Sequence, residues 1–313
     1  MRVLVTGGSG FIGRYLIRSA IERKHDVVAT YLHDGELSVP DVPKDGIRWI
    51  RLNMQDRGEV ERAVRDARAD AVFHLAAQAY AQKAWADPED TFRTNVLGTI
   101  YLYEALRTTR PARGVLISAS GAAYGVPRRL PISEDSALNP TNPYGVSKAV
   151  QDMLSLQYSL NFGLRILRAR LFGTTGPGKT GDAMNDFARQ VARIERTGRA
   201  GQVRVGNLDT LRDVSDVRDA VRALWLVFER GDPTQPVNVA AGKSYSIRDV
   251  ATTLVRLSRV PIELVSDASL LRPTDEPDNR ADVARLTNLG HTPQYPLERT
   301  ISDALDYWRA VPD

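Results

Sequence analysis

The chain has 313 residues, of which 42% are hydrophobic and 26% charged, with a formal net charge of +4. This is the composition of a globular protein, and its interspersed charges without a basic tail argue against a nucleic-acid binder. The sequence has no cysteine and only four scattered histidines, and its start lacks a leader pattern. Its apolar runs are shorter than the about 18–20 residues of a membrane span. These features predict a cytoplasmic protein without metal, disulfide or membrane segment.

Short apolar runs alternate with amphipathic segments from residue 1 to residue 172. Strands are predicted at 2–6, 26–32, 47–52, 70–76, 114–120 and 164–172, and helices at 11–23, 57–68, 89–109 and 143–161. Strands that are apolar throughout and alternate with helices indicate a parallel sheet covered on both faces. Right-handed crossovers then give an α/β fold with a doubly wound, Rossmann-type sheet.

The pattern changes after residue 172. A glycine- and threonine-rich loop precedes a helix at 183–197, a strand at 202–206, a helix at 216–230 and a strand at 236–240, and residues 246–313 are predicted to be helical with proline-containing loops. We expect a Rossmann domain and a smaller C-terminal substrate-binding lobe, interleaved in sequence. Their expected bounds are 1–172 plus about 208–240 for the domain, and 173–207 plus 241–313 for the lobe.

The segment "VTGGSGFIG" follows the first strand and opens the first helix. It places Gly7, Gly10 and Gly13 where a tight turn and close backbone approach are needed, and the helix start presents N–H groups to an anion. A glycine-rich turn without a ligand is the alternative. Because the motif heads a βαβ series, the sequence favours a dinucleotide site.

The end of the second strand reads "ATYLHD" and puts Tyr31 where readers of an unphosphorylated ribose usually carry an acid. Asp34 and Glu36 come later in the sequence. Without a carboxylate at the strand end, a 2′-phosphate is tolerated and Arg14 could meet it. The cofactor is therefore predicted to be NADP(H) or NAD(H), with a weak preference for NADPH.

The segment "TNPYGVSK" predicts a helix start at which Tyr144 and Lys148 share one face, while Ser120 ends the fifth strand. Lys148 is one of six lysines in an arginine-rich chain. A tyrosine working near neutral pH needs its pKa of about 10 lowered by about 3 units, or about 4 kcal/mol. A lysine at about 4 Å supplies roughly that much, so we expect Lys148 to lower the pKa of Tyr144 and Ser120 to polarise a carbonyl.

Seven motifs occur in an order that resembles the extended short-chain dehydrogenases/reductases that modify nucleotide sugars. They are "TGGSGFIG", "HLAA" (74–77), "NVLGT" (95–99), "SASGAAYG" (118–125), "YGVSK", "GPG" (176–178) and "RDVSDVRD" (212–219). The resemblance implies catalysis by Ser120, Tyr144 and Lys148, and a homodimer formed through two helices of each subunit. Besides Gly7, Gly10, Gly13, Arg14, Tyr31, Tyr144 and Lys148, it implies cofactor contacts from Phe11, Ile12, Asn53, Met54, Leu75, Ala76, Ala77 and Asn95.

Family members that dehydrate a nucleotide sugar carry an acid two positions after the active-site hydroxyl. Gly121, Ala122 and Ala123 follow Ser120 here, so a 4,6-dehydratase is disfavoured for want of a base. A 4-ketoreductase and a C4-epimerase with tightly bound NAD stay open. A dinucleotide sensor without catalysis is disfavoured because Tyr144 and Lys148 are both present.

Residues 187–229 and 270–308 resemble the GDP-mannose branch of this family, especially the reductases that convert GDP-4-keto-6-deoxy-D-mannose to GDP-D-rhamnose. By that resemblance a GDP-sugar is the expected substrate. Arg212 and Arg272 would contact its diphosphate, and Val205 and Asn207 would lie against its base. Gly173 would line the sugar site with Ser120 and Tyr144, although relatives often carry asparagine there.

Overall fold

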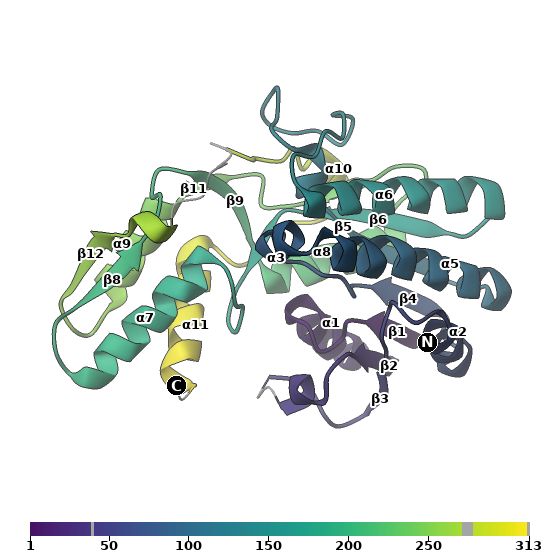
Figure 1. The fold of residues 1–313 in the computed structure, drawn as a ribbon, viewed down its shortest axis with the longest axis horizontal. Coiled ribbons are helices and arrows are strands. Elements are labelled where there is room, and N and C mark those ends of the chain that lie inside the picture. The colour runs from purple at the N-terminus through teal and green to yellow at the C-terminus, as the bar shows by residue number, and fades with distance from the viewer. Residues whose placement is uncertain (39–40, 271–277, 312–313) are drawn as a thin grey trace.

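The computed structural model describes residues 1–38, 41–270 and 278–311, which form a larger and a smaller body (Figure 1). The larger body contains a seven-stranded sheet in the order β10-β6-β5-β4-β1-β2-β3, in which every pairing is parallel. The predicted α/β, Rossmann-type sheet is thus confirmed. Its strands are β1 (Arg2–Thr6), β2 (Asp26–Tyr31), β3 (Ile47–Arg51), β4 (Ala71–His74), β5 (Gly114–Ser120), β6 (Ile166–Leu171) and β10 (Val237–Val239).

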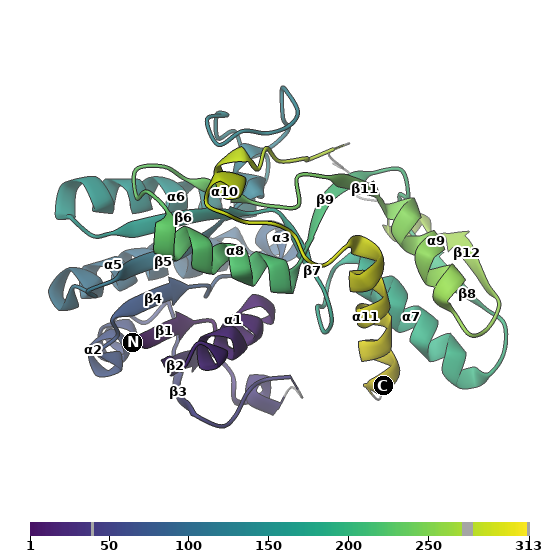
Figure 2. The same ribbon diagram turned by 180° about the vertical axis from the view of Figure 1, so that it is seen from behind.

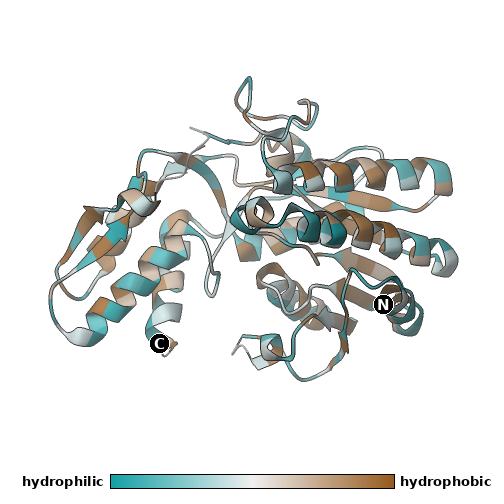
Figure 3. Cartoon of the chain, viewed as in Figure 1, coloured by the Kyte–Doolittle hydropathy of each residue, from teal (hydrophilic) through white to brown (hydrophobic). Residues whose placement is uncertain are grey.

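Helices cover both faces of this sheet, and each face has its own hydrophobic core. One face packs against α2 (Arg57–Ala67), α5 (Gly98–Thr109) and α6 (Pro143–Phe162). The view from behind shows α1 (Phe11–Glu22), α8 (Val217–Arg230) and α10 (Ala284–Asn288) over the other (Figure 2). Hydrophobic and hydrophilic residues alternate along α5 and α6, as expected of helices with one buried face (Figure 3). No helix among the described residues is long and apolar enough to cross a membrane.

The helix predicted at 89–109 is present at residues 88–109 with one π-helical turn inside it, and a short helix before it was not predicted. The structure has α3 (Ala81–Ala86), α4 (Pro88–Phe92), one π-helical turn (Arg93–Leu97) and then α5. The break before α4 has a local cause, because the Asp87 side chain accepts a hydrogen bond from Asp90 N and Pro88 occupies the first helical position. Aspartate followed by proline starts a new helix.

The smaller body is built from α7 (Ala183–Thr197), α9 (Ile247–Leu257), α11 (Leu297–Ala310) and the parallel strands β8 (Gly201–Val205) and β12 (Ile262–Ser266). A three-stranded sheet of β7 (Gly173–Thr175), β9 (Leu211–Asp216) and β11 (Ser244–Ser246) links the bodies. The expectation that 246–313 is helical is therefore wrong at β12. Ile262 and Leu264 lie on either side of the exposed Glu263 and pack into the core of this body, as expected of a half-buried strand.

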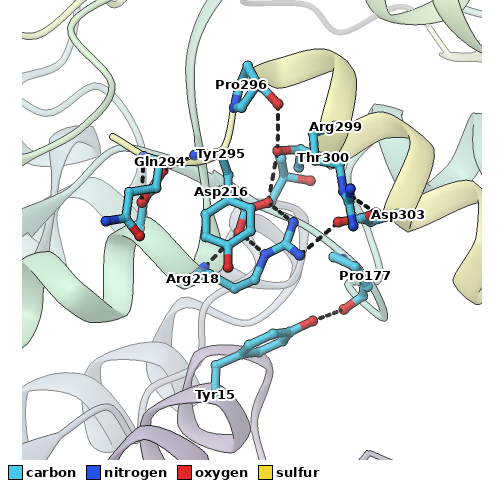
Figure 4. Close-up of polar contacts among 12 residues, drawn as sticks. Tyr15, Pro177, Asp216, Arg218, Gln294, Tyr295, Pro296, Arg299, Thr300 and Asp303 are labelled. Carbon is cyan, nitrogen blue, oxygen red and sulfur yellow. Dashed lines mark hydrogen bonds and ion pairs between the residues drawn. The ribbon is translucent and has the colours of Figure 1, made fainter. Parts of the chain in front are cut away.

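Side chains at the junction fasten the two bodies together (Figure 4). Arg218 at the start of α8 donates hydrogen bonds to Asp216 and, at 2.7 Å, to Asp303 of α11. The hydroxyl of Tyr15 in α1 donates to the carbonyl of Pro177 at 2.9 Å. Charged side chains with fixed partners at a junction favour one relative position of the bodies.

Candidate active site

The glycine loop packs so tightly that its glycines cannot carry side chains. Gly7 has φ +68°, and a Cβ on it would lie 2.7 Å from Ala76 N. A Cβ on Gly13 would overlap the carbonyl oxygen of Gly7. The loop therefore lies directly against the segment after β4, and the backbone is open to a ligand at the end of β1.

The helix that begins at this loop lacks the side-chain cap that starts five of the other helices. α2, α6, α7, α8 and α9 are capped by the side chains of Asp56, Asn142, Asp182, Asp216 and Ser246. α1 begins after Gly10 with no side-chain cap and no acid in its first turn, and Phe11 and Ile12 are half-buried there. An uncapped helix start behind a glycine loop fits the pyrophosphate of a dinucleotide.

A carboxylate does stand at the end of β2, contrary to the sequence argument. Glu36 lies in a short 3-10 helix (Asp34–Ser38) that turns back, and its Oε2 accepts hydrogen bonds from Ser9 Oγ and from Leu32 N. The half-buried Tyr31 packs edge-on against Trp49. The position of Glu36 could not be predicted because it comes after the end of β2 in the sequence. The turn brings its carboxylate back beside the glycine loop.

Arg14 is directed toward the smaller body. Its side chain is buried, Nη2 donates to Gly178 O at 3.0 Å, and Nη1 lies 3.8 Å from Asp41. Nε and Nη1 form no hydrogen bond with the described residues. A contact between Arg14 and a 2′-phosphate stays a prediction.

The remaining predicted cofactor residues fall into two groups. Leu75, Ala76 and Ala77 are half-buried beside the glycine loop, and so is Asn53 after β3. Met54 and Asn95 are buried in the scaffold, and the Asn95 amide bonds to Gln78 and Ser147. These last two side chains support the site from behind.

Ser120 and Tyr144 meet where β5 ends and α6 begins. Asn142 caps α6 through a 2.8 Å hydrogen bond from Gly145 N, so the helix begins at Pro143 as its sequence predicted. A Cβ on Gly145 would lie 2.6 Å from Ala122 O, so the first turn of α6 packs directly on the turn after Ser120. The Ser120 hydroxyl lies near Tyr144 and opposes the rise of the Tyr144 pKa, and Ser120 Oγ accepts a hydrogen bond from Ala122 N at 3.2 Å.

Lys148 is buried one turn further along α6. Its Nζ donates to Ser118 O at 3.0 Å and lies 5.9 Å from the centre of the Tyr144 ring. Burial lowers the pKa of Lys148 to about 7. A lysine with such a pKa carries only part of its charge near neutral pH.

The expected lowering of the Tyr144 pKa is not what the structure shows. Burial raises the pKa of Tyr144 above its ordinary value, and the nearby Ser120 hydroxyl only partly opposes this. The desolvated phenol therefore stays protonated near neutral pH. From the sequence, Lys148 is expected to be fully charged and the phenol to be exposed. In the structure, burial lowers the pKa of Lys148 and raises the pKa of Tyr144.

A cavity of about 240 Å³ opens over Ser120. Its lining residues are Ser120, Gly121, Ala122, Gly125, Ile132, Leu171, Phe172, Gly173 and Asn279. Among these described residues there is no carboxylate. A Cβ on Gly173 would lie 2.5 Å from Asp213 O, so the close approach of β7 to β9 leaves no room for a side chain there.

The other predicted substrate residues are dispersed. Val205 is buried in the core of the smaller body, and Asn207 is exposed and accepts a hydrogen bond from Asp209 N. Arg212 is half-buried and donates to Leu211 O at 2.8 Å. Arg272 lies outside the described residues. Asn279, which sequence reasoning missed, is in the cavity instead, and no local pattern marks it.

Behind the cavity, a buried polar network holds the turn after Ser120. Arg170 on β6 donates to both carboxylate oxygens of Asp152 on α6 and, at 2.7 Å, to the hydroxyl of Tyr124. Tyr124 in turn donates to Asn238 on β10. Burial raises the pKa of Tyr124 to about 12, which makes it a structural hydroxyl. Satisfied networks of this kind rigidify the elements that they join.

A family model described as GDP-mannose 4,6 dehydratase matches residues 4–304. The chain belongs to that family. It is an NAD(P)-dependent enzyme of the extended short-chain dehydrogenase/reductase type, as its motifs predicted. Membership settles the fold and the class of enzyme, whereas members differ in the reaction.

Several relatives span essentially the whole chain. The GDP-6-deoxy-D-mannose reductase of Pseudomonas aeruginosa is 32% identical over 99% of this chain and 97% of its own. The structure of RMD from the same organism, complexed with NADPH, has a TM-score of 0.84 at 29% identity and 99% coverage of both chains. A UDP-glucose 4-epimerase of Thermotoga maritima with UDP-glucose reaches a TM-score of 0.90 at 25% identity, with the same coverage. The similarity thus includes reductases and epimerases.

Proposed function

We propose that the enzyme reduces the C4 keto group of a nucleotide-linked 4-keto-6-deoxy sugar, with GDP-4-keto-6-deoxy-D-mannose as substrate and GDP-D-rhamnose as product. The observation that carries the proposal is the cavity over Ser120, whose described lining contains no carboxylate, together with Tyr144 near the Ser120 hydroxyl. A dehydratase needs a base at this place, whereas ketone reduction needs only a proton donor and a hydride donor.

The protonation state of Tyr144 suits this direction. Reduced nicotinamide, when bound, supplies the hydride that C4 accepts while the C=O bond becomes C–O⁻. Tyr144, a phenol that is protonated near neutral pH, donates a proton to that oxygen, and the product is an alcohol. The Ser120 hydroxyl holds the same oxygen, and Lys148, whose Nζ lies 5.9 Å from the centre of the Tyr144 ring, supplies positive charge near the phenolate.

For the nucleotide, support comes from the 32% identical GDP-6-deoxy-D-mannose reductase. For the cofactor, the NADPH complex of RMD supports NADPH. The carboxylate of Glu36 beside the glycine loop should weaken the preference for a 2′-phosphate, because both groups are negative. We propose that both NADPH and NADH are accepted. A chain without cysteine needs no oxidising compartment to fold, and we propose a cytoplasmic enzyme.

The test is turnover of the keto sugar. Purified enzyme with GDP-4-keto-6-deoxy-D-mannose and NADPH is expected to consume the absorbance of reduced nicotinamide and to form a deoxy sugar whose C4 configuration NMR identifies. The dTDP- and UDP-linked keto sugars serve as comparison substrates. No consumption with any of the three would contradict the proposal.

A C4-epimerase is the second candidate, favoured by the TM-score of 0.90 to a UDP-glucose 4-epimerase. An epimerase recycles its cofactor and retains it, whereas a reductase exchanges it at each turnover. Mass spectrometry of the small molecules released from denatured, freshly purified protein separates the two. Stoichiometric NAD together with interconversion of sugars without net redox would favour the epimerase.

We also propose a homodimer formed through α5 and α6. Val146, Met153 and Leu160 recur every seven residues along α6 and are exposed by 36%, 63% and 65% of their surface. Residues spaced by seven lie on one face of a helix, and Leu97 before α5 is also exposed. A double substitution, Met153→Glu with Leu160→Glu, is expected to convert a dimer to a monomer in light scattering after gel filtration.

A further inference from the structure

We infer that Asn279 recognises the sugar: its side-chain amide donates a hydrogen bond to a hydroxyl oxygen of the sugar bound over Ser120. The inference rests on the proposed function and names a residue that decides which sugars fit. It starts from the cavity, where Asn279 is half-buried and faces the space also lined by Ser120 and Gly173.

The orientation of the Asn279 amide is fixed by its partner. Its Oδ1 accepts a hydrogen bond from the backbone N–H of Asp213 at 2.9 Å. A backbone N–H can only donate, so the oxygen must face Asp213 and the –NH2 group must face away. Among the described residues, the –NH2 group has no partner, and both of its N–H groups are available to a ligand.

The backbone around Asn279 is held from two sides. The buried carboxylate of Asp213 accepts from Ala241 N, Gly242 N and Ala281 N at 2.9, 3.0 and 3.1 Å. On the other side, Ile132 N donates to Arg280 O at 2.8 Å. A donor whose position is set in advance contributes more to binding than one that must be ordered on binding.

The rest of the described lining explains why a sugar needs this donor. Besides Ser120 and Asn279, it consists of glycine, alanine, isoleucine, leucine and phenylalanine, whose side chains form no hydrogen bonds. Ser120 is engaged with Tyr144 at the reacting carbonyl. A hexose brings several hydroxyl oxygens into this space, and the amide of Asn279 is the described side chain left to bind one.

The test compares two ligands by calorimetry, GDP-mannose and GDP, which differ by the sugar. Asn279→Asp keeps an oxygen for Asp213 N and removes the N–H donors. We expect it to weaken GDP-mannose binding about tenfold and to leave GDP and NADPH within about twofold. Asn288→Asp, an exposed residue on the same C-terminal segment, controls for the added charge. Asn279→Ala, checked by thermal melting, covers the case in which the new carboxylate near Asp213 prevents folding.

The outcomes separate the two proposals. Wild-type protein that binds GDP-mannose more tightly than GDP, with that advantage lost in Asn279→Asp and Asn279→Ala, supports sugar recognition. Equal weakening of GDP and GDP-mannose, or no weakening, overturns it and leaves the reductase proposal standing. Wild-type protein that binds no nucleotide sugar overturns the proposed function itself, and the role of Asn279 with it.

Discussion

The two walls of the active site are built in different ways. On the wall of the larger body, Ser120 ends a strand, and Tyr144 and Lys148 lie four residues apart in the first turns of a capped helix. On the other wall, formed by the linking sheet and the segment before α10, Gly173 and Asn279 are more than a hundred residues apart and both lie against Asp213. The first wall follows from local geometry, and the second depends on long-range hydrogen bonds. If the proposed roles hold, variants on the two walls should affect turnover and sugar binding separately.

The largest effect is expected from Tyr144→Phe, which disables the first wall alone. Removal of the proton donor should lower kcat by about a thousandfold. Binding of NADPH and GDP-mannose, measured by calorimetry, should stay within about threefold, because the ring and its packing remain. A kcat within tenfold of the wild type would show that another group donates the proton.

Asp213→Asn disrupts the second wall. The carboxylate accepts three backbone N–H groups, and an amide nitrogen in its place leaves at least one without an acceptor, at a cost of about 2 kcal/mol in the free energy of unfolding. Urea denaturation measures this, and KM for the sugar nucleotide should rise more than kcat falls. Asp209→Asn, at an exposed position before β9, is the matched control. A fall in kcat alone would contradict the separation of the walls.

Lys148→Met tests the buried lysine of the first wall through the pH dependence of the free energy of unfolding. Burial lowers the pKa of Lys148 to about 7 in the folded state, whereas the unfolded chain keeps it near 10.4. Between these values the unfolded state binds more protons, so wild-type stability rises with pH, and the variant lacks this rise. From about pH 7 to pH 9, the wild type should gain on the order of 1–2 kcal/mol relative to the variant in urea denaturation. A difference that is independent of pH would mean that the folded lysine has an ordinary pKa.

Glu36→Gln should give the smallest effect. Glu36 lies beside the glycine loop and belongs to neither wall of the cavity. Removing the carboxylate beside Ser9 should raise the preference for NADPH over NADH about fivefold, or about 1 kcal/mol, because a like charge near the 2′-phosphate is lost. The ratio of the two Kd values is the measurement. Asp34→Asn, exposed in the same short helix, should leave that ratio unchanged.

The sequence predicted those parts of the molecule that short-range rules determine. The strands of the large sheet, the glycine loop and the start of α6 all lie where periodicity and capping placed them. The short helix α3 before Asp87 was missed, and β12 was missed because a short, mostly apolar run of five residues does not by itself distinguish a strand from a helix.

The features that could not be predicted depend on folding at longer range. Glu36 reaches the glycine loop through a turn, and Asn279 reaches the cavity through Asp213. The raised pKa of Tyr144 depends on burial, which sequence spacing does not reveal. The roles predicted for Arg212 and Arg272 stay predictions.

The edge strand β10 and the helix α10 complete the core of the larger body, yet they lie at Val237–Val239 and Ala284–Asn288. During synthesis, the ribosome must therefore deliver α7 and β8 of the smaller body before the sheet can acquire its last strand. Until then β6 presents an open edge of the kind that recruits other chains. Nascent chains stalled between residues 172 and 236 should consequently be the species that depend most on chaperones.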